Sequence, residues 1–373
     1  MHKINQNHSR RIFLTRLSTA GIALALNPIS SWAVEEQDPK IKNIVTRIMG
    51  IDAHNHMDLP FNKAEFKGQK YELAGELKNS GFTAIAMTFC VDRPALTKEG
   101  EAWERFITTL DEMDEILKEN GLTRVLKAAD LKEAYSKNKQ IVIQSVEGGH
   151  FIEGRLERIE IAYKRGLRHI GLMHDGQSSP PMGDIYTDPP KYGGLTEFGV
   201  NTIKESNRLG ILIDLAHCST DAVNKAIEIS TRPMIISHTG LNTQLGGDEQ
   251  MAKMMMPRLI SKEQAKIFAA VGGVIGVWTH LANSPLDYAR NIRALVDIVG
   301  TEHVSMGTDT KMAPPSNAPD RFGKKTNLSW DNEKQGFFYV VVDALLKTGF
   351  AEKEIEQIGG GNYSRIFAKA MSS

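Results

Sequence analysis

The chain has 373 residues, of which 41% are hydrophobic and 24% are charged, with 45 basic and 45 acidic residues. This composition is that of a soluble globular protein, and it excludes a disordered, collagen-like or polytopic membrane chain. The balanced charge argues against a nucleic-acid-binding protein, which needs a basic surface. Two cysteines are too few for a disulfide-rich scaffold. Because Cys90 and Cys218 lie in apolar, strand-like contexts, we expect buried thiols rather than a disulfide.

Residues 1–33 have the features of an export signal. The pair Arg10-Arg11 precedes an apolar stretch at 17–26, and 31–33 offer small residues for cleavage. The apolar stretch is too short to span a bilayer stably, and the twin arginines resemble a bacterial twin-arginine (Tat) signal. We therefore expect the Tat export machinery to recognise the precursor, a periplasmic location, and one mature domain at 34–373. An ordinary Sec signal or an uncleaved anchor is the alternative.

Eight short β-branched runs recur along the rest of the chain, and polar stretches with helical spacing separate them. The runs lie at 48–56, 82–89, 141–148, 169–174, 211–217, 233–238, 273–278 and 303–309. Near-continuous apolar strands separated by helices imply a parallel sheet with helices on its outside. Eight such units in a chain of this length predict an α/β fold of the (β/α)8 or TIM-barrel class.

Helical periodicity is clearest at 103–117, 196–209 and 261–270. Ser261 followed by Gln264 predicts a capping box at the start of the third helix. Three segments rich in Pro and Gly, at 175–194, 239–257 and 310–330, are predicted to be structured loops rather than helices. Each follows a strand, so each is expected over the end of the barrel where active sites lie.

Residue types that bind metals follow strand after strand. His54 and His56 stand two residues apart on the first strand, so both side chains are expected on one face, the barrel lumen. Glu147 ends the third strand, where an unpaired carboxylate would be costly to bury. His217 and His238 follow the fifth and sixth strands. Because the carboxyl ends of barrel strands converge, these residues predict a site for divalent cations, and imidazole nitrogens favour zinc.

Each candidate also has an ordinary structural role open to it. Histidines such as His217 and His238 are often hydrogen-bonded core residues, and Glu147 could cap a helix or join an ion pair. As part of the constellation, Glu147 could bridge two cations that share a hydroxide. Asp309, after the eighth strand, is placed to accept a proton from the attacking water and return it to the leaving amine. Its structural alternative is an N-cap.

With these residues in place, the chain resembles the membrane dipeptidase (renal dipeptidase-like) family of the amidohydrolase superfamily. The resemblance covers nearly the whole mature chain in family order. It is carried by Asp52-Ala53-His54-Asn55, Asp58-Leu59-Pro60, Val146-Glu147-Gly148-Gly149-His150, Gly194-Leu195-Thr196-Glu197-Phe198-Gly199, Leu212-Ile213-Asp214-Leu215-Ala216-His217, Ile236-Ser237-His238, Gly272-Gly273-Val274-Ile275-Gly276-Val277 and Gly361-Asn362-Tyr363.

The resemblance implies a metal-dependent (β/α)8 barrel with two divalent metal ions, expected to be zinc. Glu147 would bridge the ions, with His54 on one and with His217 and His238 on the other. His174 resembles the family histidine that contacts substrate and polarises the scissile carbonyl.

By the same resemblance, Arg258 would clamp the carboxylate of a dipeptide, and Asp309 would serve in proton transfer. Two departures stand out. His56-Met57 intervenes where the family usually reads His-Asn-Asp-Leu-Pro, so the second ligand on the first strand is either His56 or Asp58, and the strand spacing favours His56. The segment 310–312 lacks the usual Phe-Asp-Gly.

We therefore predict a periplasmic zinc dipeptidase that cleaves the amide bond of a small dipeptide through a metal-bridged hydroxide, with catalytic roles for Glu147, His174 and Asp309. One alternative is an amidohydrolase acting on another amide, a lactam or an ester. The other is a catalytically silent periplasmic barrel that binds metal or peptide. The family often forms dimers, so a homodimer is possible, and no nucleic-acid partner is expected.

Overall fold

The computed structural model describes residues 38–313, 324–330 and 335–372, and the predicted export signal lies outside them. Within these ranges, none of the helices combines the length and the apolar character needed to traverse a bilayer.

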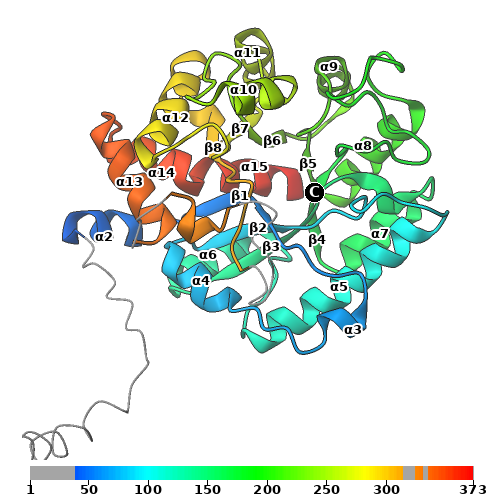
Figure 1. Ribbon diagram of the computed structural model, residues 1–373, viewed down its shortest axis with the longest axis horizontal. Helices are drawn as coiled ribbons and strands as arrows, with labels where there is room; N and C mark the ends of the chain where they lie inside the picture. The colour runs from blue at the N-terminus through cyan, green and yellow to red at the C-terminus, as the bar shows by residue number, and fades with distance from the viewer. Residues whose placement is uncertain (1–37, 314–323, 331–334, 373) are drawn as a thin grey trace, which may run out of the picture. The chain divides into compact units, whose positions relative to one another are not determined.

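A parallel sheet occupies the centre of the domain (Figure 1). Its spatial order follows the chain order of the strands up to the eighth, and all of its neighbours are parallel. The strands are β1 (Ile51–His56), β2 (Ala84–Thr88), β3 (Ile141–Val146), β4 (Leu167–Gly171), β5 (Leu212–Asp214), β6 (Met234–Thr239), β7 (Val274–Val277), β8 (Val304–Met306) and β9 (Thr310–Lys311). Each of the eight predicted runs overlaps one of the strands β1 to β8.

The eighth strand, predicted at 303–309, ends already at Met306, and a further short strand directly after the predicted run closes the sheet. β8 pairs with β7, and β9, a few residues later, pairs with β1 through the partners Thr310 and Asn55. Between β8 and β9 the backbone N–H of Asp309 donates to the carbonyl of His54 at 3.1 Å. One stretch of chain therefore joins both edges of the sheet, and the predicted (β/α)8 barrel is confirmed.

Helices surround the sheet, and their apolar faces pack against it (Figure 1). The helix predicted at 103–117 is longer than expected, because its buried face runs from Ala102 to Leu117. The helices are α2 (Pro39–Thr46), α3 (Lys63–Phe66), α4 (Leu73–Ser80), α5 (Glu101–Glu119), α6 (Ala128–Ser136), α7 (Glu157–Lys164), α8 (Glu197–Leu209), α9 (Thr220–Ile229), α10 (Glu249–Met255), α11 (Lys262–Ala270), α12 (Pro285–Val299), α13 (Phe337–Lys347), α14 (Glu352–Glu356) and α15 (Asn362–Met371).

The barrel interior is filled at one end by apolar side chains and closed there by α15. Tyr363 and Phe367 of α15 are buried in one cluster with Ile51, Ile143 and Leu212 of the strands. Helix α15 contacts β1 and β5 to β8, and Figure 1 shows it crossing the middle of the ring. This apolar plug leaves only the opposite end of the barrel for polar chemistry.

A bulge in β1 aims its histidines into the barrel. The pairing of β1 with β2 shifts between Asp52 and Asn55, so β1 has one residue more than β2 over that interval. Before the bulge Ile51 and Ala53 join the apolar interior cluster, and after it His54 and His56 point toward the polar end. The bulge therefore converts an apolar face into a ligand-bearing face at the place where the apolar plug stops.

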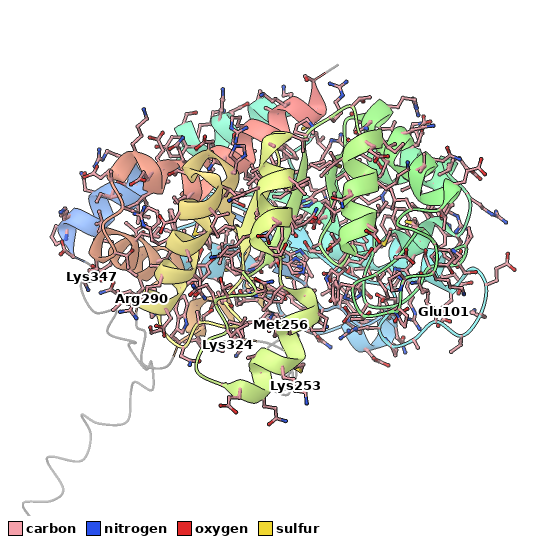
Figure 2. All side chains as sticks on the ribbon, turned by 90° about the horizontal axis from the view of Figure 1, so that it is seen from above. Glu101, Lys253, Met256, Arg290, Lys324 and Lys347 are labelled. Atoms are coloured by element: carbon pink, nitrogen blue, oxygen red, sulfur yellow. The ribbon has the colours of Figure 1, made fainter. Side chains whose placement is uncertain are left out.

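Two local predictions need correction. The segment 239–257 was expected to lack helices, but it contains α10, whose N-cap Asp248 accepts from the Met251 N–H. Figure 2 shows this helix, which carries the labelled Lys253, projecting from the barrel. Ser261 caps α11 as predicted, yet Gln264 donates to Asn224 instead of completing a capping box. Cys90 and Cys218 are unpaired as expected, although Cys90 is only partly buried.

Candidate metal centre

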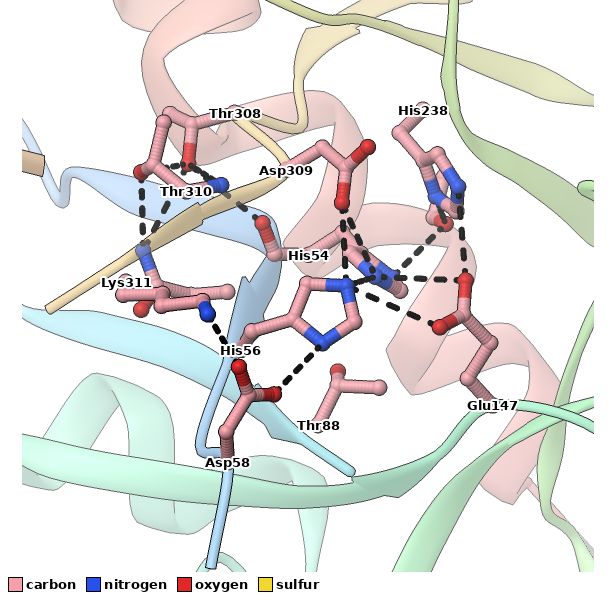
Figure 3. Close-up of polar contacts among 12 residues, drawn as sticks. His54, His56, Asp58, Thr88, Glu147, His238, Thr308, Asp309, Thr310 and Lys311 are labelled. Atoms are coloured by element: carbon pink, nitrogen blue, oxygen red, sulfur yellow. Dashed lines mark hydrogen bonds and ion pairs between the residues drawn. The ribbon is translucent and has the colours of Figure 1, made fainter. Parts of the chain in front are cut away.

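The Glu147 carboxylate, at the carboxyl end of β3, lies among five imidazoles. Its Oε1 is 2.8 Å from His217 Nε2, 3.5 Å from His54 Nε2 and 3.5 Å from His238 Nε2. Its Oε2 is 3.4 Å from His174 Nε2 and 3.6 Å from His56 Nε2. The structure therefore brings together all of the histidines that the sequence singled out, and each presents its Nε2 atom to the same carboxylate. Figure 3 shows this arrangement for His54, His56 and His238.

Asp309 faces the two histidines of β1 across the same space (Figure 3). Its Oδ1 lies 3.0 Å from His56 Nε2 and 3.8 Å from His54 Nε2. Its Oδ2 accepts from His280 Nε2 at 2.6 Å. Asp309 has a φ of 55° and His217 a φ of 67°, which lie in the left-handed region that non-glycine residues seldom adopt. Such strain is held in place by surrounding structure and is common at functional sites.

Asp58, the other candidate ligand on the first strand, stands outside the cluster. Its side chain is 48% exposed and pairs with Lys311, and its Oδ1 is 3.7 Å from His56 Nδ1, the outer nitrogen of that ring. The geometry therefore favours His56 over Asp58 as the ligand.

The outer nitrogens of four imidazoles meet hydrogen-bonding partners. His174 Nδ1 lies 2.7 Å from Asp92 Oδ1, and His217 Nδ1 lies 3.0 Å from Asp175 Oδ1. The Ser237 hydroxyl lies 2.8 Å from His238 Nδ1 and 3.3 Å from His54 Nδ1. Ser237 donates its own proton to Asp214 at 2.5 Å and can therefore accept from both rings. These partners place the ring protons on Nδ1 and leave the Nε2 lone pairs for a cation.

The two carboxylates of the cluster are ionised. Burial opposes the ionisation of Glu147, but the neighbouring His174, His54 and His217 outweigh it and hold its pKa well below the usual range. Burial likewise opposes ionisation of Asp309, and His238 and His280 outweigh it and keep its pKa far below normal. The buried Glu147 and Asp309 carboxylates therefore provide negative charge that would attract a cation.

In the absence of a cation, the histidines of the cluster do not all carry the same charge. Burial disfavours the charged form of His56, but its hydrogen bond to Asp309 and the charge of Glu147 raise its pKa to about 10. Burial and repulsion from His238 lower the pKa of His54. The crowded rings therefore cannot all be protonated together, and a divalent cation bound by neutral rings would relieve that conflict.

The donor set fits divalent metal ions. Glu147 Oε2 is buried without a hydrogen-bond partner, as expected for an atom that serves as a ligand. In the described part of the chain, four groups of three residues each have ligand atoms within 4.8 Å of one another. Three of them include His54 or Glu147: His54, His56 and Asp309; Glu147, His174 and His217; and His54, Asp214 and His238. Mixed imidazole and carboxylate donors of this kind suit divalent metal ions.

Arg258 lies beside this cluster rather than in it. Its guanidinium, on a 3-10 turn at Met256–Arg258, donates to Asp175 Oδ2 at 2.9 Å and lies over the ring of Tyr186. One pocket is lined by Arg258 and Tyr186 together with His217 and His238. The arginine side chain is 27% exposed, so its remaining N–H groups can reach a ligand.

Sequence reasoning assigned no role to Asp92, Asp175, Asp214, Ser237 or His280, although Asp175 and Asp214 were among the ligand-type residues noted at the ends of the fourth and fifth strands. Asp92 follows β2 and His280 follows β7, and no site residue was predicted after either of these strands. Their position after a strand was the available signal. For Ser237 and Asp214, which lie in strands, nothing in the sequence indicated a contact with two histidines.

Comparison with known proteins gives the family. The model of the family described as "Membrane dipeptidase (Peptidase family M19)" matches residues 39–372. A curated relative, dipeptidase 3 of Macaca fascicularis, is 26% identical over 243 residues, which is 63% of this chain and 46% of that protein. The match thus spans about half the length of this relative.

Solved structures agree with the barrel fold. An amidohydrolase from Pseudomonas aeruginosa has a TM-score of 0.72 at 20% identity, over 89% of this chain and 99% of its own. A metallopeptidase from Rhodobacter sphaeroides, solved with a phosphinate mimic of the dipeptide L-Ala-D-Ala, has a TM-score of 0.67 at 16% identity, over 87% and 99%. With the family match over nearly the whole described chain, this protein belongs to the membrane dipeptidase family, peptidase family M19.

Proposed function

We propose that this protein is a periplasmic, zinc-dependent dipeptidase. The observation that carries the proposal is the Glu147 carboxylate surrounded by the Nε2 atoms of five histidines, with Asp309 alongside. Membership of a dipeptidase family supports the reaction class, and nitrogen-rich donors support zinc.

Two zinc ions would share the Glu147 carboxylate. His54 and His56 would hold one ion, and His217 and His238 the other. When bound, such ions acidify water and polarise a carbonyl oxygen, which is the chemistry that amide hydrolysis needs.

The chain's own residues supply proton transfer and orientation. Asp309 Oδ2 is held by His280, whereas Oδ1 faces the cluster and would be the oxygen that takes a proton from water and returns it to the leaving amine. His174, fixed by Asp92, directs Nε2 into the site and would orient the scissile carbonyl. One N–H group of Arg258 binds Asp175, and its other N–H groups would bind the carboxylate of the substrate. A guanidinium binds a carboxylate with two parallel hydrogen bonds.

These roles point to a small substrate with a free carboxylate, that is, a dipeptide. The L-Ala-D-Ala mimic bound by the Rhodobacter sphaeroides metallopeptidase supports the inclusion of dipeptides with a D-residue at the carboxyl end.

Metal analysis and hydrolysis assays on the purified protein test the proposal. We expect two equivalents of zinc per chain and hydrolysis of L-Ala-L-Ala or L-Ala-D-Ala that stops on chelation and returns with zinc. Arg258→Met should raise KM for the dipeptide at least tenfold but not for the dipeptide amide, which lacks the carboxylate. Arg290→Met, on an exposed arginine of α12, is the matched control.

Three outcomes contradict the proposal in different ways. Fewer than one equivalent of zinc would remove the metal centre. Zinc binding without hydrolysis of any dipeptide would indicate a silent barrel. Equal effects of Arg258→Met on the dipeptide and its amide would indicate another amide, a lactam or an ester as substrate.

Export is a separate part of the proposal. Arg10-Arg11 supports passage through the Tat machinery. Replacement of both arginines by lysine should leave the precursor uncleaved in the cytoplasm of the expressing bacterium, whereas continued export would contradict a Tat signal. A homodimer is also proposed, and the mass of the purified protein by light scattering tests it.

A further inference from the structure

Asp175, in the segment after β4, binds four side chains at the edge of the candidate metal centre. Its Oδ1 accepts from the Tyr186 hydroxyl at 2.6 Å and from His217 Nδ1 at 3.0 Å. Its Oδ2 accepts from Arg258 at 2.9 Å and from Arg93. The Asp175 side chain is 14% exposed, so most of its hydrogen bonding comes from these groups rather than from water.

The four partners come from different parts of the barrel rim. Arg93 follows β2, Tyr186 lies in the same segment as Asp175, His217 follows β5, and Arg258 follows β6. Two of these partners, Arg93 and Arg258, are cations that pair with the Asp175 carboxylate. Asp175 is therefore an acceptor on which several loops converge.

His217 is the partner that links Asp175 to the cluster. Its Nε2 lies 2.8 Å from Glu147 Oε1 and 3.1 Å from His238 Nε2. Its backbone is in the left-handed region, so local preference does not hold the ring in place. The ring depends on contacts at its other nitrogen, where Asp175 and Tyr186 are the acceptors.

Resting on the proposed function, we propose that Asp175 is a positioning residue. As a carboxylate it holds His217 with its ring proton on Nδ1, so that the Nε2 lone pair faces the cation site. A carboxylate in this role fixes the tautomer and raises the basicity of a metal-binding imidazole. The second oxygen of Asp175 holds Arg258 beside the same histidine, which couples the substrate end of the site to the metal end.

Metal affinity of the Asp175→Asn variant tests the proposal. The side-chain amide of this variant has one acceptor oxygen in place of two. Its NH2 group would face an N–H donor of either His217 or Arg258, so one of these two hydrogen bonds would be lost. We expect one of the two zinc ions to bind about 10- to 100-fold more weakly and the other to bind as before. The measurement is competition between the metal-free full-length protein and a chromophoric zinc chelator.

Three further variants separate this role from general damage to the site. Asp188→Asn changes an exposed aspartate of the same segment and should leave both affinities unchanged. Asp175→Glu keeps the charge and should recover part of the lost affinity. Tyr186→Phe removes the neutral partner of His217 and should have a smaller effect than Asp175→Asn. Circular dichroism establishes that each variant is folded.

The proposal is overturned if Asp175→Asn binds both zinc ions like the wild type, or if Tyr186→Phe reproduces the whole loss of affinity. If the wild-type protein binds two zinc ions but cleaves no dipeptide, the proposed function is contradicted. The zinc affinities of the Asp175 variants can still be measured in that case. The two failures are therefore distinguishable.

Discussion

The direction in which each imidazole points matters more at this site than the number of histidines. His54, His174, His217 and His238 all turn Nε2 inward, and each has an acceptor at Nδ1. A histidine without such a partner can flip its ring or exchange its tautomer, and either change removes a lone pair from the centre. The acceptors therefore belong to the site as much as the rings do.

Asp92 gives a test of this argument at the substrate side. Both of its oxygens lie within 2.9 Å of His174 Nδ1. Asp92→Asn should lower kcat for dipeptide hydrolysis by up to about 100-fold, because the ring loses the carboxylate that fixes its direction. Since Asp92 hydrogen-bonds His174, which is not one of the proposed zinc ligands, zinc content should stay at the wild-type level.

Steady-state kinetics together with metal analysis separate the two effects, with Asp188→Asn as the control. An unchanged kcat would show that Asp92 does not orient a reacting group. A loss of zinc would instead assign His174 to the metal ions.

The sequence was sufficient to predict which side chains would meet, but not how they would bind each other. His54, Glu147, His217, His238 and Asp309 were recognisable because each is a polar residue at the end of an apolar run. The contact between Arg258 and Asp175 depends on how two long loops fold over the rim, and no local pattern encodes it. The strand spacing already favoured His56 over Asp58, and the structure adds that Asp58 is 48% exposed and pairs with Lys311.

At the scale of elements, the strands were predictable because their apolar runs are long and fully buried. Helix α10 was not, because a helix of 7 residues has little intrinsic stability and depends on its cap and its packing. The division of the last strand into β8 and β9 was also hidden, since the sequence of 303–311 does not reveal which edge each part joins.

Side chains in the first turns of α5 form hydrogen bonds with the loop after β2, which carries Asp92 and Arg93. Glu101, labelled in Figure 2, accepts from the Thr97 N–H at 2.6 Å and binds Arg105 at 2.6 Å. Arg105 in turn donates to the carbonyl of Val91 at 2.8 Å. These contacts tie the loop after β2 to a helix that packs on the barrel.

Glu101 should make stability depend on pH. Hydrogen bonds from Thr97, first from its backbone and then from its hydroxyl, lower the pKa of Glu101 from 4.5 to about 2. A carboxylate whose pKa is lowered by folding stabilises the protein above pH 4.5, and this contribution disappears as the pH falls from 4.5 toward 2. Glu101→Gln should therefore reduce the free energy of unfolding at pH 7 and reduce it less at pH 3.

Urea denaturation of wild type and Glu101→Gln between pH 3 and pH 7 measures the difference. Glu104→Gln, at an exposed position of the same helix, is the matched control. A difference that is constant over the whole range would show that the charge of Glu101 does not contribute.

At the scale of the whole domain, the position of the site follows from the side chains that fill the interior of the barrel. Apolar residues and α15 close one end, so the histidines and carboxylates of the candidate metal centre gather at the other. Repetition of strand and helix was enough to predict the ring, because eight such units leave few other ways to bury their strands. The plug by α15 was not predicted, since a C-terminal amphipathic helix could equally have packed on the outside.

Because the ligands come from strands around the ring, metal binding should stabilise the entire barrel. Without a cation, Glu147, Asp309 and the histidines leave a buried centre whose charges are balanced only among themselves. A ligand that binds only the folded state adds stability, about 4 kcal/mol at a free concentration 1,000 times its Kd. Removal of zinc should therefore lower the Tm by several degrees, and added zinc should restore it.

Scanning calorimetry of the chelator-treated protein measures this effect, with magnesium as the control cation. Magnesium prefers oxygen ligands and should restore little of the lost Tm, because the centre is built mainly from imidazole nitrogens. Equal Tm values with and without zinc would mean that the histidines from different strands do not share a bound ion. Equal recovery with magnesium would place the cation on the carboxylates alone.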